Sequence, residues 1–141
     1  MPDTGFVLDS QLDNDTHEVG RMRLSRVLLM NDARYPWLIL VPERPNLAEL
    51  IDLSAPDRAL LWDEIAQASE VLQAMYGPDK LNVAALGNMV RQLHVHVVAR
   101  FTSDPAWPRP VWGSGAPLAY EPHQQGIIAQ RLAKALGIEQ D

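Results

Sequence analysis

Apolar residues in the first third of the chain are grouped in a way that predicts three short strands. Residues 17–23 alternate loosely between polar and apolar, and residues 24–30 are mostly apolar. Residues 37–41 form a continuous apolar run that ends at Pro42, as expected of a buried strand. Residues 31–36 begin with Asn-Asp and end with proline, which favours a turn. Connections this short predict an antiparallel meander.

A long helix is predicted next, from Ser54 to Tyr76. Ser54 is suited to cap it, Asp57 follows three residues later as in a capping box, and Gly77-Pro78 ends it. Apolar residues recur every three or four positions and predict one buried face: Leu60, Leu61, Ile65, Ala68, Val71, Leu72 and Met75.

The second half of the chain predicts two more strands and a short helix. Residues 80–86 and 93–101 read as strands, separated by a turn or bulge at Gly87-Asn88. Residues 102–122 contain five prolines and predict irregular chain on the surface, and residues 127–136 predict a short amphipathic helix. Strands on both sides of a long helix indicate the α+β class, with an antiparallel sheet of about five strands, one long helix and one short helix.

Composition limits the class of protein. The 141 residues form a single domain, 1–141, and the net charge of −6 argues against a protein that binds nucleic acid polymers through bulk charge. No cysteine is present, so disulfides, thiolate metal sites and a cysteine nucleophile are excluded. No apolar run is long enough to span a membrane, and Met1–Thr4 do not resemble a leader peptide, so a cytoplasmic location is expected by default.

Candidate chemistry is concentrated in the segment Gln92-Leu93-His94-Val95-His96-Val97-Val98. On a strand, Gln92, His94, His96 and Val98 share one face, while the residues between them pack into the core. Imidazole titrates near neutral pH and is also a competent nucleophile. The spacing therefore predicts a rigid polar row with catalytic potential.

This segment resembles the motif of the histidine triad (HIT) family, His-φ-His-φ-His-φ-φ with φ apolar, except that Gln92 replaces the first histidine. The order of elements around it, from the early strands through the long helix, also resembles the family. The resemblance covers about residues 20–102, and residues 103–141 are an irregular tail and a C-terminal helix.

The resemblance implies a nucleotidyl hydrolase or transferase, acting on nucleotide conjugates such as phosphoramidates and dinucleoside polyphosphates. His94, at the middle position, would attack the α-phosphate and form a nucleotidyl-histidine, with its other ring nitrogen held by a backbone carbonyl. His96 would donate to phosphate oxygens or to the leaving group. Asn88 falls where relatives contact phosphate, Asn31 where some hold ribose, and Gln92 could still order the row. No cofactor is implied, and members commonly form homodimers by extending the sheet and packing the long helices.

Two alternative functions stay open. Gln92 cannot become cationic, and Met89 stands where some relatives carry a hydroxyl, which favours nucleotide binding without significant turnover as the first alternative. His94 and His96 could instead ligate zinc in a metal-dependent hydrolase, which needs a third ligand that neither His17 nor His123 supplies by spacing. 

The sequence predicts structural roles for three other polar and aromatic residues. Arg100 is expected to be a surface salt-bridge partner. Trp107 and Trp112 are expected to pack the irregular tail onto the sheet, with stacking on a base as the alternative.

Overall fold

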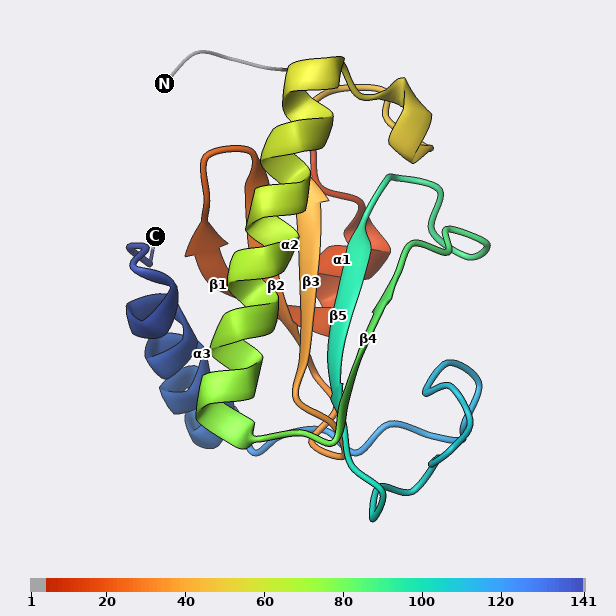
Figure 1. The fold of residues 1–141 in the computed structure, drawn as a ribbon, viewed down its shortest axis with the longest axis vertical. Helices are drawn as coiled ribbons and strands as arrows, with labels where there is room; N and C mark the ends of the chain where they lie inside the picture. The colour runs from red at the N-terminus through yellow and green to blue at the C-terminus, as the bar shows by residue number, and fades with distance from the viewer. Residues whose placement is uncertain (1–4, 141) are drawn as a thin grey trace.

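The computed structural model describes residues 5–140 and contains a five-stranded antiparallel sheet (Figure 1). The strand order is β1-β2-β3-β5-β4, which confirms the predicted α+β class and meander. Met1–Thr4, on which the expectation of no leader peptide depends, lie outside the described residues. The strands are β1 Thr16–Arg21, β2 Ser25–Met30, β3 Trp37–Pro42, β4 Lys80–Ala84 and β5 Val95–Arg100.

The helices are more numerous than the sequence predicts. They are α1 Ser10–Asp15, the 3-10 turn η1 Leu50–Asp52, α2 Ala55–Tyr76 and α3 Pro122–Leu136. The long helix α2 has the predicted ends, because the Ser54 side chain caps it and Gly77 adopts a left-handed conformation after it. The Asp57 carboxylate binds Arg44 rather than closing a capping box. Helix α1 was not predicted, because six residues are too few to show a helical period.

Among the described residues, no helix is long and apolar enough to cross a membrane.

Two apolar clusters lie on opposite faces of the sheet. Helices α2 and α3 pack on one face, against residues that include Val95, Val97 and Ala99 of β5. Helix α1 and the irregular segment 102–121 cover the other face, on which Val98 of β5 lies (Figure 1). Successive residues of β5 therefore belong to different cores, as the two-residue period of a strand requires.

Arg100 is not at the surface as expected. Its side chain is only 2% exposed and forms an ion pair with Asp104 at 2.8 Å. The guanidinium also donates to Asn82 Oδ1 and to the Arg109 carbonyl. Arg100 therefore ties the irregular segment to the sheet, a role that depends on the return of residues 104–109 over the end of β5.

Candidate active site

The two imidazoles of the predicted row lie together on the sheet face opposite α2. Their ring centroids are 4.8 Å apart, at an interplanar angle of 69°. His96 is in β5, opposite Ile39 of β3 and Ala84 of β4, whereas His94 lies just before the strand begins. Both residues are largely buried, at 6% exposure for His94 and 5% for His96. The aliphatic neighbours Leu93, Val95 and Val97 pack into the core behind them.

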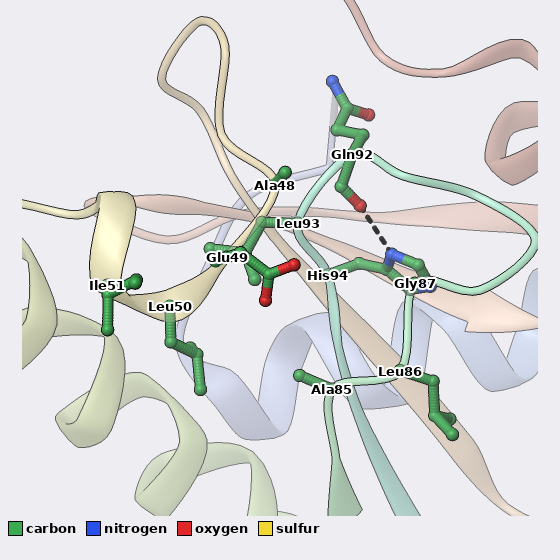
Figure 2. A pocket seen from close by; sticks show the side chains of 10 residues that line it. All are labelled: Ala48, Glu49, Leu50, Ile51, Ala85, Leu86, Gly87, Gln92, Leu93 and His94. Carbon is green, nitrogen blue, oxygen red and sulfur yellow. Dashed lines mark hydrogen bonds between the residues drawn. The ribbon is translucent and has the colours of Figure 1, made fainter.

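A backbone carbonyl fixes the tautomer of His94. Its Nδ1 lies 2.7 Å from the carbonyl oxygen of Gln92 (Figure 2). A carbonyl oxygen only accepts hydrogen bonds, so Nδ1 carries the proton. In the neutral ring Nε2 therefore holds a free lone pair. This arrangement agrees with the expectation that a backbone carbonyl holds one nitrogen of His94.

An indole fixes the opposite tautomer in His96. The Nε1–H of Trp37 donates to Nδ1 of His96 at 3.0 Å. Because an indole N–H can only donate, Nδ1 of His96 must accept, and the proton of the neutral ring is on Nε2. Burial, assisted by the nearby His94, lowers the pKa of His96 from its usual 6.5 to about 3. His96 is therefore a neutral ring with an Nε2–H donor at neutral pH.

Trp37 was missed as a site residue, although the sequence carries a signal for it. It is the first residue of the apolar run 37–41, and it lies two positions from Ile39, which is directly opposite His96. Residues two positions apart on a strand share a face, and diagonal neighbours on paired strands are within reach of large side chains. Only the strand register, which the sequence did not provide, brings Trp37 to His96.

Both imidazoles line a hollow of about 270 Å³. A larger adjoining hollow of about 510 Å³ shares four of its lining residues, Asp15, Met30, Met89 and Trp112. A third hollow, of about 210 Å³, lies on the other side of His94, and the carboxylate of Glu49 points into it (Figure 2). His94 thus stands between two hollows, and space for a ligand extends from the imidazoles towards Trp37 and Trp112.

Gln92 does not extend the row of side chains. Its amide points away from His94 (Figure 2), donates to the Val7 carbonyl at 2.8 Å and accepts from the Asp9 N–H at 2.9 Å. The strand alternation that predicted a shared face does not apply, because Gln92 lies in a bend before β5 begins. The residue instead joins the N-terminal segment to the site, and its carbonyl is the group that meets His94.

The two asparagines lie in different hollows. Asn88 lines the hollow that contains both histidines, next to Met89, whose side chain is 97% exposed. Asn31 lines the adjoining hollow, where its Oδ1 accepts from the Tyr120 N–H at 2.9 Å. The structure therefore places Asn88 in the hollow with the imidazoles and Asn31 in the adjoining hollow.

A charged pair in the adjoining hollow was also missed. Asp32 is buried and accepts from the Arg34 side chain at 2.9 and 3.0 Å. Burial alone would raise the pKa of Asp32, but hydrogen bonds from Arg34 and the Leu118 N–H outweigh it and lower the pKa. The pair is locally neutral, and it holds the irregular segment because Arg34 also donates to the Ser114 carbonyl.

The metal alternative lacks a set of ligands. Within residues 5–140, no group of three or more His, Cys, Asp or Glu side chains is placed to hold a metal ion. Nδ1 of both site histidines is already in a hydrogen bond, so each ring has only Nε2 to offer. The arrangement supplies two potential ligands, where zinc sites in proteins generally use three or four.

Comparison with known proteins identifies relatives of the whole arrangement. The model of the HIT domain family matches residues 11–103. A histidine triad protein from Bradyrhizobium japonicum is 47% identical, with a TM-score of 0.90 over 93% of this chain and 98% of that chain. One from Marinobacter aquaeolei is 45% identical, with a TM-score of 0.91 over 94% and 96%. One from Sinorhizobium meliloti is 42% identical, with a TM-score of 0.90 over 94% and 98%.

The search of curated proteins found no match to this chain.

Proposed function

The chain belongs to the histidine triad (HIT) family, and from this we propose that it hydrolyses or transfers nucleotide conjugates at the α-phosphate through a nucleotidyl-His94 intermediate. Family membership supports a nucleotide hydrolase or transferase in general. The choice of residues and steps below is our inference from the site.

The pair of opposite tautomers is the observation that carries the proposal. His94 presents a lone pair on Nε2, and His96 presents a proton on Nε2, with the two rings 4.8 Å apart at the wall of one hollow. Attack at phosphorus needs both a nucleophile and a donor for the non-bridging oxygens. Groups that are already oriented need no reorganisation during the reaction.

The proposed reaction has two displacement steps. In the first, the lone pair of His94 Nε2 forms a bond to phosphorus, and the bond to the leaving group breaks with its electron pair on the leaving group. The ring then carries positive charge, which the Gln92 carbonyl stabilises through the Nδ1 hydrogen bond. In the second, a water oxygen forms a bond to phosphorus and its proton goes to solvent, while the bond from phosphorus to Nε2 breaks with its electron pair on Nε2. Hydrolysis yields the nucleoside monophosphate.

The test is to trap the intermediate. The protein is mixed with a purine nucleoside phosphoramidate, quenched within milliseconds to seconds, digested and examined by mass spectrometry, with amine release followed in parallel. We expect a nucleotidyl adduct on the peptide that contains His94, and its loss in His94→Ala. The matched control is His123→Ala, because His123 is an exposed histidine at the start of α3. Absence of both the adduct and amine release in wild type would contradict the proposal.

A second candidate function, nucleotide binding without significant turnover, is favoured by two observations. Gln92 replaces the first motif histidine and uses its side chain on the N-terminal segment, and Met89 is an exposed apolar residue at the mouth of the hollow. This candidate predicts that AMP raises the melting temperature while amine release stays at the background rate. Addition of a chelator to the same assay tests the metal-dependent alternative, which predicts that the activity is lost.

We also propose that the chain forms a homodimer through β4. This strand is at the edge of the sheet, where its outer backbone groups are available for pairing. An apolar hollow of about 350 Å³ lies beside it, and the nearby side chains Val83 and Trp62 are 46% and 67% exposed. The opposite edge, β1, is in contact with α3.

The dimer is tested by light scattering of the purified chain across a concentration series. We expect the mass of two chains for wild type and a shift towards one chain for Trp62→Glu. The control is Leu118→Glu, because Leu118 is an exposed apolar residue of the irregular segment, away from β4 in sequence. A single-chain mass for wild type at high micromolar concentration would contradict this proposal.

A further inference from the structure

We propose that Trp37 is a positioning residue, whose indole N–H holds His96 as a fixed neutral donor, so that His96 binds substrate oxygen but gives no proton to the leaving group. The role in turnover depends on the proposed function, whereas the tautomer of His96 does not. Sequence reasoning left both roles of His96 open, and the Trp37 contact decides between them.

The geometry leaves the indole little freedom. Trp37 is 6% exposed and is paired with Val98 across the β3–β5 ladder. Its ring makes edge contacts with Tyr35 and Trp112, at centroid distances of 6.3 and 6.0 Å. The Nε1–H is therefore held at Nδ1 of His96. Turning the imidazole over would place a ring carbon at this donor and leave a buried N–H without an acceptor.

The same contact opposes protonation of His96. A cationic ring carries a proton on both nitrogens, so Nδ1–H would meet the Nε1–H of Trp37, donor against donor. The ionisable groups that line the hollow with His96 are His94 and Asp15. Asp32 and Arg34 line the adjoining hollow and are paired with each other. Asp15 is exposed and its carboxylate accepts from the Gln11 side chain, and the buried carboxylate of Asp32 is neutralised by Arg34, so neither carboxylate favours a cationic His96.

This assignment restricts the leaving group. When the bond from phosphorus to the leaving group breaks, the electron pair leaves with it, and the proton that neutralises it must come from solvent. The nitrogen of a phosphoramidate can take a proton from solvent before the P–N bond breaks, so that a neutral amine leaves, and a phosphate leaves as a stable anion. The oxygen of an alkyl ester is too weakly basic to be protonated beforehand, and an alkoxide is a poor leaving group. We therefore expect nucleoside phosphoramidates to be turned over and the matching alkyl phosphodiesters to remain intact.

The direct test is NMR of the imidazole nitrogens in uniformly ¹⁵N-labelled protein without substrate. In wild type we expect His96 to be the Nε2–H tautomer from pH 5 to pH 8, and His94 to be the Nδ1–H tautomer when neutral. A through-hydrogen-bond coupling between Trp37 Nε1 and His96 Nδ1 would confirm the contact in the unaltered protein. An Nδ1–H tautomer, or a His96 that titrates near pH 6, would overturn the proposal without any variant.

Two matched variants separate the hydrogen bond from ring packing. Trp37→Phe removes the donor and keeps an aromatic ring. We expect a mixture of His96 tautomers, a His96 pKa that is higher than in wild type, and about a tenfold lower kcat/KM for the phosphoramidate, as for the loss of one neutral hydrogen bond. Trp112→Phe is the control, because Trp112 contacts the same ring at 5.2 Å but its N–H has no hydrogen-bond partner within residues 5–140.

Trp112→Phe should leave the His96 tautomer and its pH behaviour as in wild type. If both variants change the tautomer equally, packing rather than the Trp37 hydrogen bond is responsible and the proposal fails. If the tautomer is as expected but no adduct forms on His94, the proposed function fails and the assignment of Trp37 to His96 stands.

Discussion

The two faces of the sheet are stabilised by different kinds of interaction. On the α2 and α3 face, contacts are almost entirely apolar and join β5 to the helices through Val95, Val97 and Ala99. On the opposite face, the same strand presents His96, Val98 and Arg100, and its cover is a six-residue helix and an irregular segment. That cover is held partly by apolar packing of Leu12, Ala106 and Val111 and partly by hydrogen bonds and ion pairs, of which Arg100–Asp104 at 2.8 Å is the most buried.

The difference shows how a small domain supports a polar site. The stability of the α2 and α3 face comes mainly from apolar burial, which does not depend on protonation. Glu64 of α2 is an ionisable exception, since its buried carboxylate accepts from the Leu24 and Ser25 N–H groups. The polar face then carries groups whose burial is costly unless each is hydrogen-bonded. His94 and His96 satisfy this condition with one bond each at Nδ1, which leaves Nε2 of both rings for a ligand.

The largest expected effect is on activity at the polar face. His94→Ala should reduce phosphoramidate turnover by about 10³-fold or more, because it removes the nucleophile, while the free energy of unfolding changes by less than about 2 kcal/mol. Turnover is measured by amine release and stability by urea denaturation. Retention of more than a tenth of the activity would contradict the role of His94.

The next effect is on the stability of the polar face. Asp104→Asn should lower the free energy of unfolding by about 3–5 kcal/mol, because it leaves Arg100 as a buried charge without its partner. Urea denaturation at pH 7 measures this. The control is Asp79→Asn, since Asp79 accepts one exposed N–H bond from Thr102 and should cost about 1 kcal/mol.

Lowering the pH should destabilise the face that carries His96 and Arg100 more than the face covered by α2 and α3. Burial would raise the pKa of Asp104, but hydrogen bonds from Arg100 and from the N–H groups of Phe101 and Trp107 lower it to about 2. The folded pKa is below the unfolded value of 3.8, so this stabilisation is present above about pH 4 and is lost as the pH falls towards 2. His96 also has a lowered pKa, so its contribution is lost as the pH falls from about 6.5 towards 3.

Urea denaturation curves from pH 7 to pH 2 test the direction of this pH dependence. Wild type should lose stability throughout the range, and Asp104→Asn should lose less than wild type below pH 4. The free energy of unfolding of the variant will still fall with pH, because the pKa of Asp32 is lowered as well. A variant that loses as much stability as wild type in that range would show that Asp104 is not a source of the acid sensitivity.

The apolar face is tested by Leu72→Ala. Leu72 of α2 is fully buried, so truncation should cost about 2–5 kcal/mol by lost burial and a cavity. The loss should be the same at pH 5 and pH 7, and turnover per folded molecule should stay within about twofold of wild type. Leu118→Ala, at an exposed position, should cost less than about 0.5 kcal/mol.

The smallest effect concerns the link between the site and the N-terminal segment. Gln92→Ala removes two side-chain bonds, to Val7 and Asp9, but keeps the carbonyl that meets His94. We expect a loss of about 1–2 kcal/mol, faster amide exchange in residues 7–15, and turnover reduced by less than tenfold. A loss of activity as large as that of His94→Ala would mean that the Gln92 amide acts directly on substrate.

Much of the fold and part of the site could be read from local patterns. The five strands, the ends of α2 and the placement of His94 and His96 on one face follow from residue spacing and capping, and the structure confirms them. Several of the missed features are long-range contacts. Gln92 binds residues 83–85 positions away, Trp37 meets His96 from 59 positions away, and Arg100 is buried by chain that folds back over it.

The sequence alone determined which residue types were available and on which side of a strand they would lie, because the period of a strand is fixed by backbone geometry. The tertiary structure alone decided what those residues do. A neutral histidine ring can carry its proton on either nitrogen, and the partner at Nδ1 decides which. A carbonyl at Nδ1 leaves His94 with a lone pair on Nε2, as a nucleophile needs, and an indole N–H at Nδ1 leaves His96 with a proton on Nε2, as a donor needs. Such partners are set by strand register and by the path of the chain before β5, which no local pattern specifies.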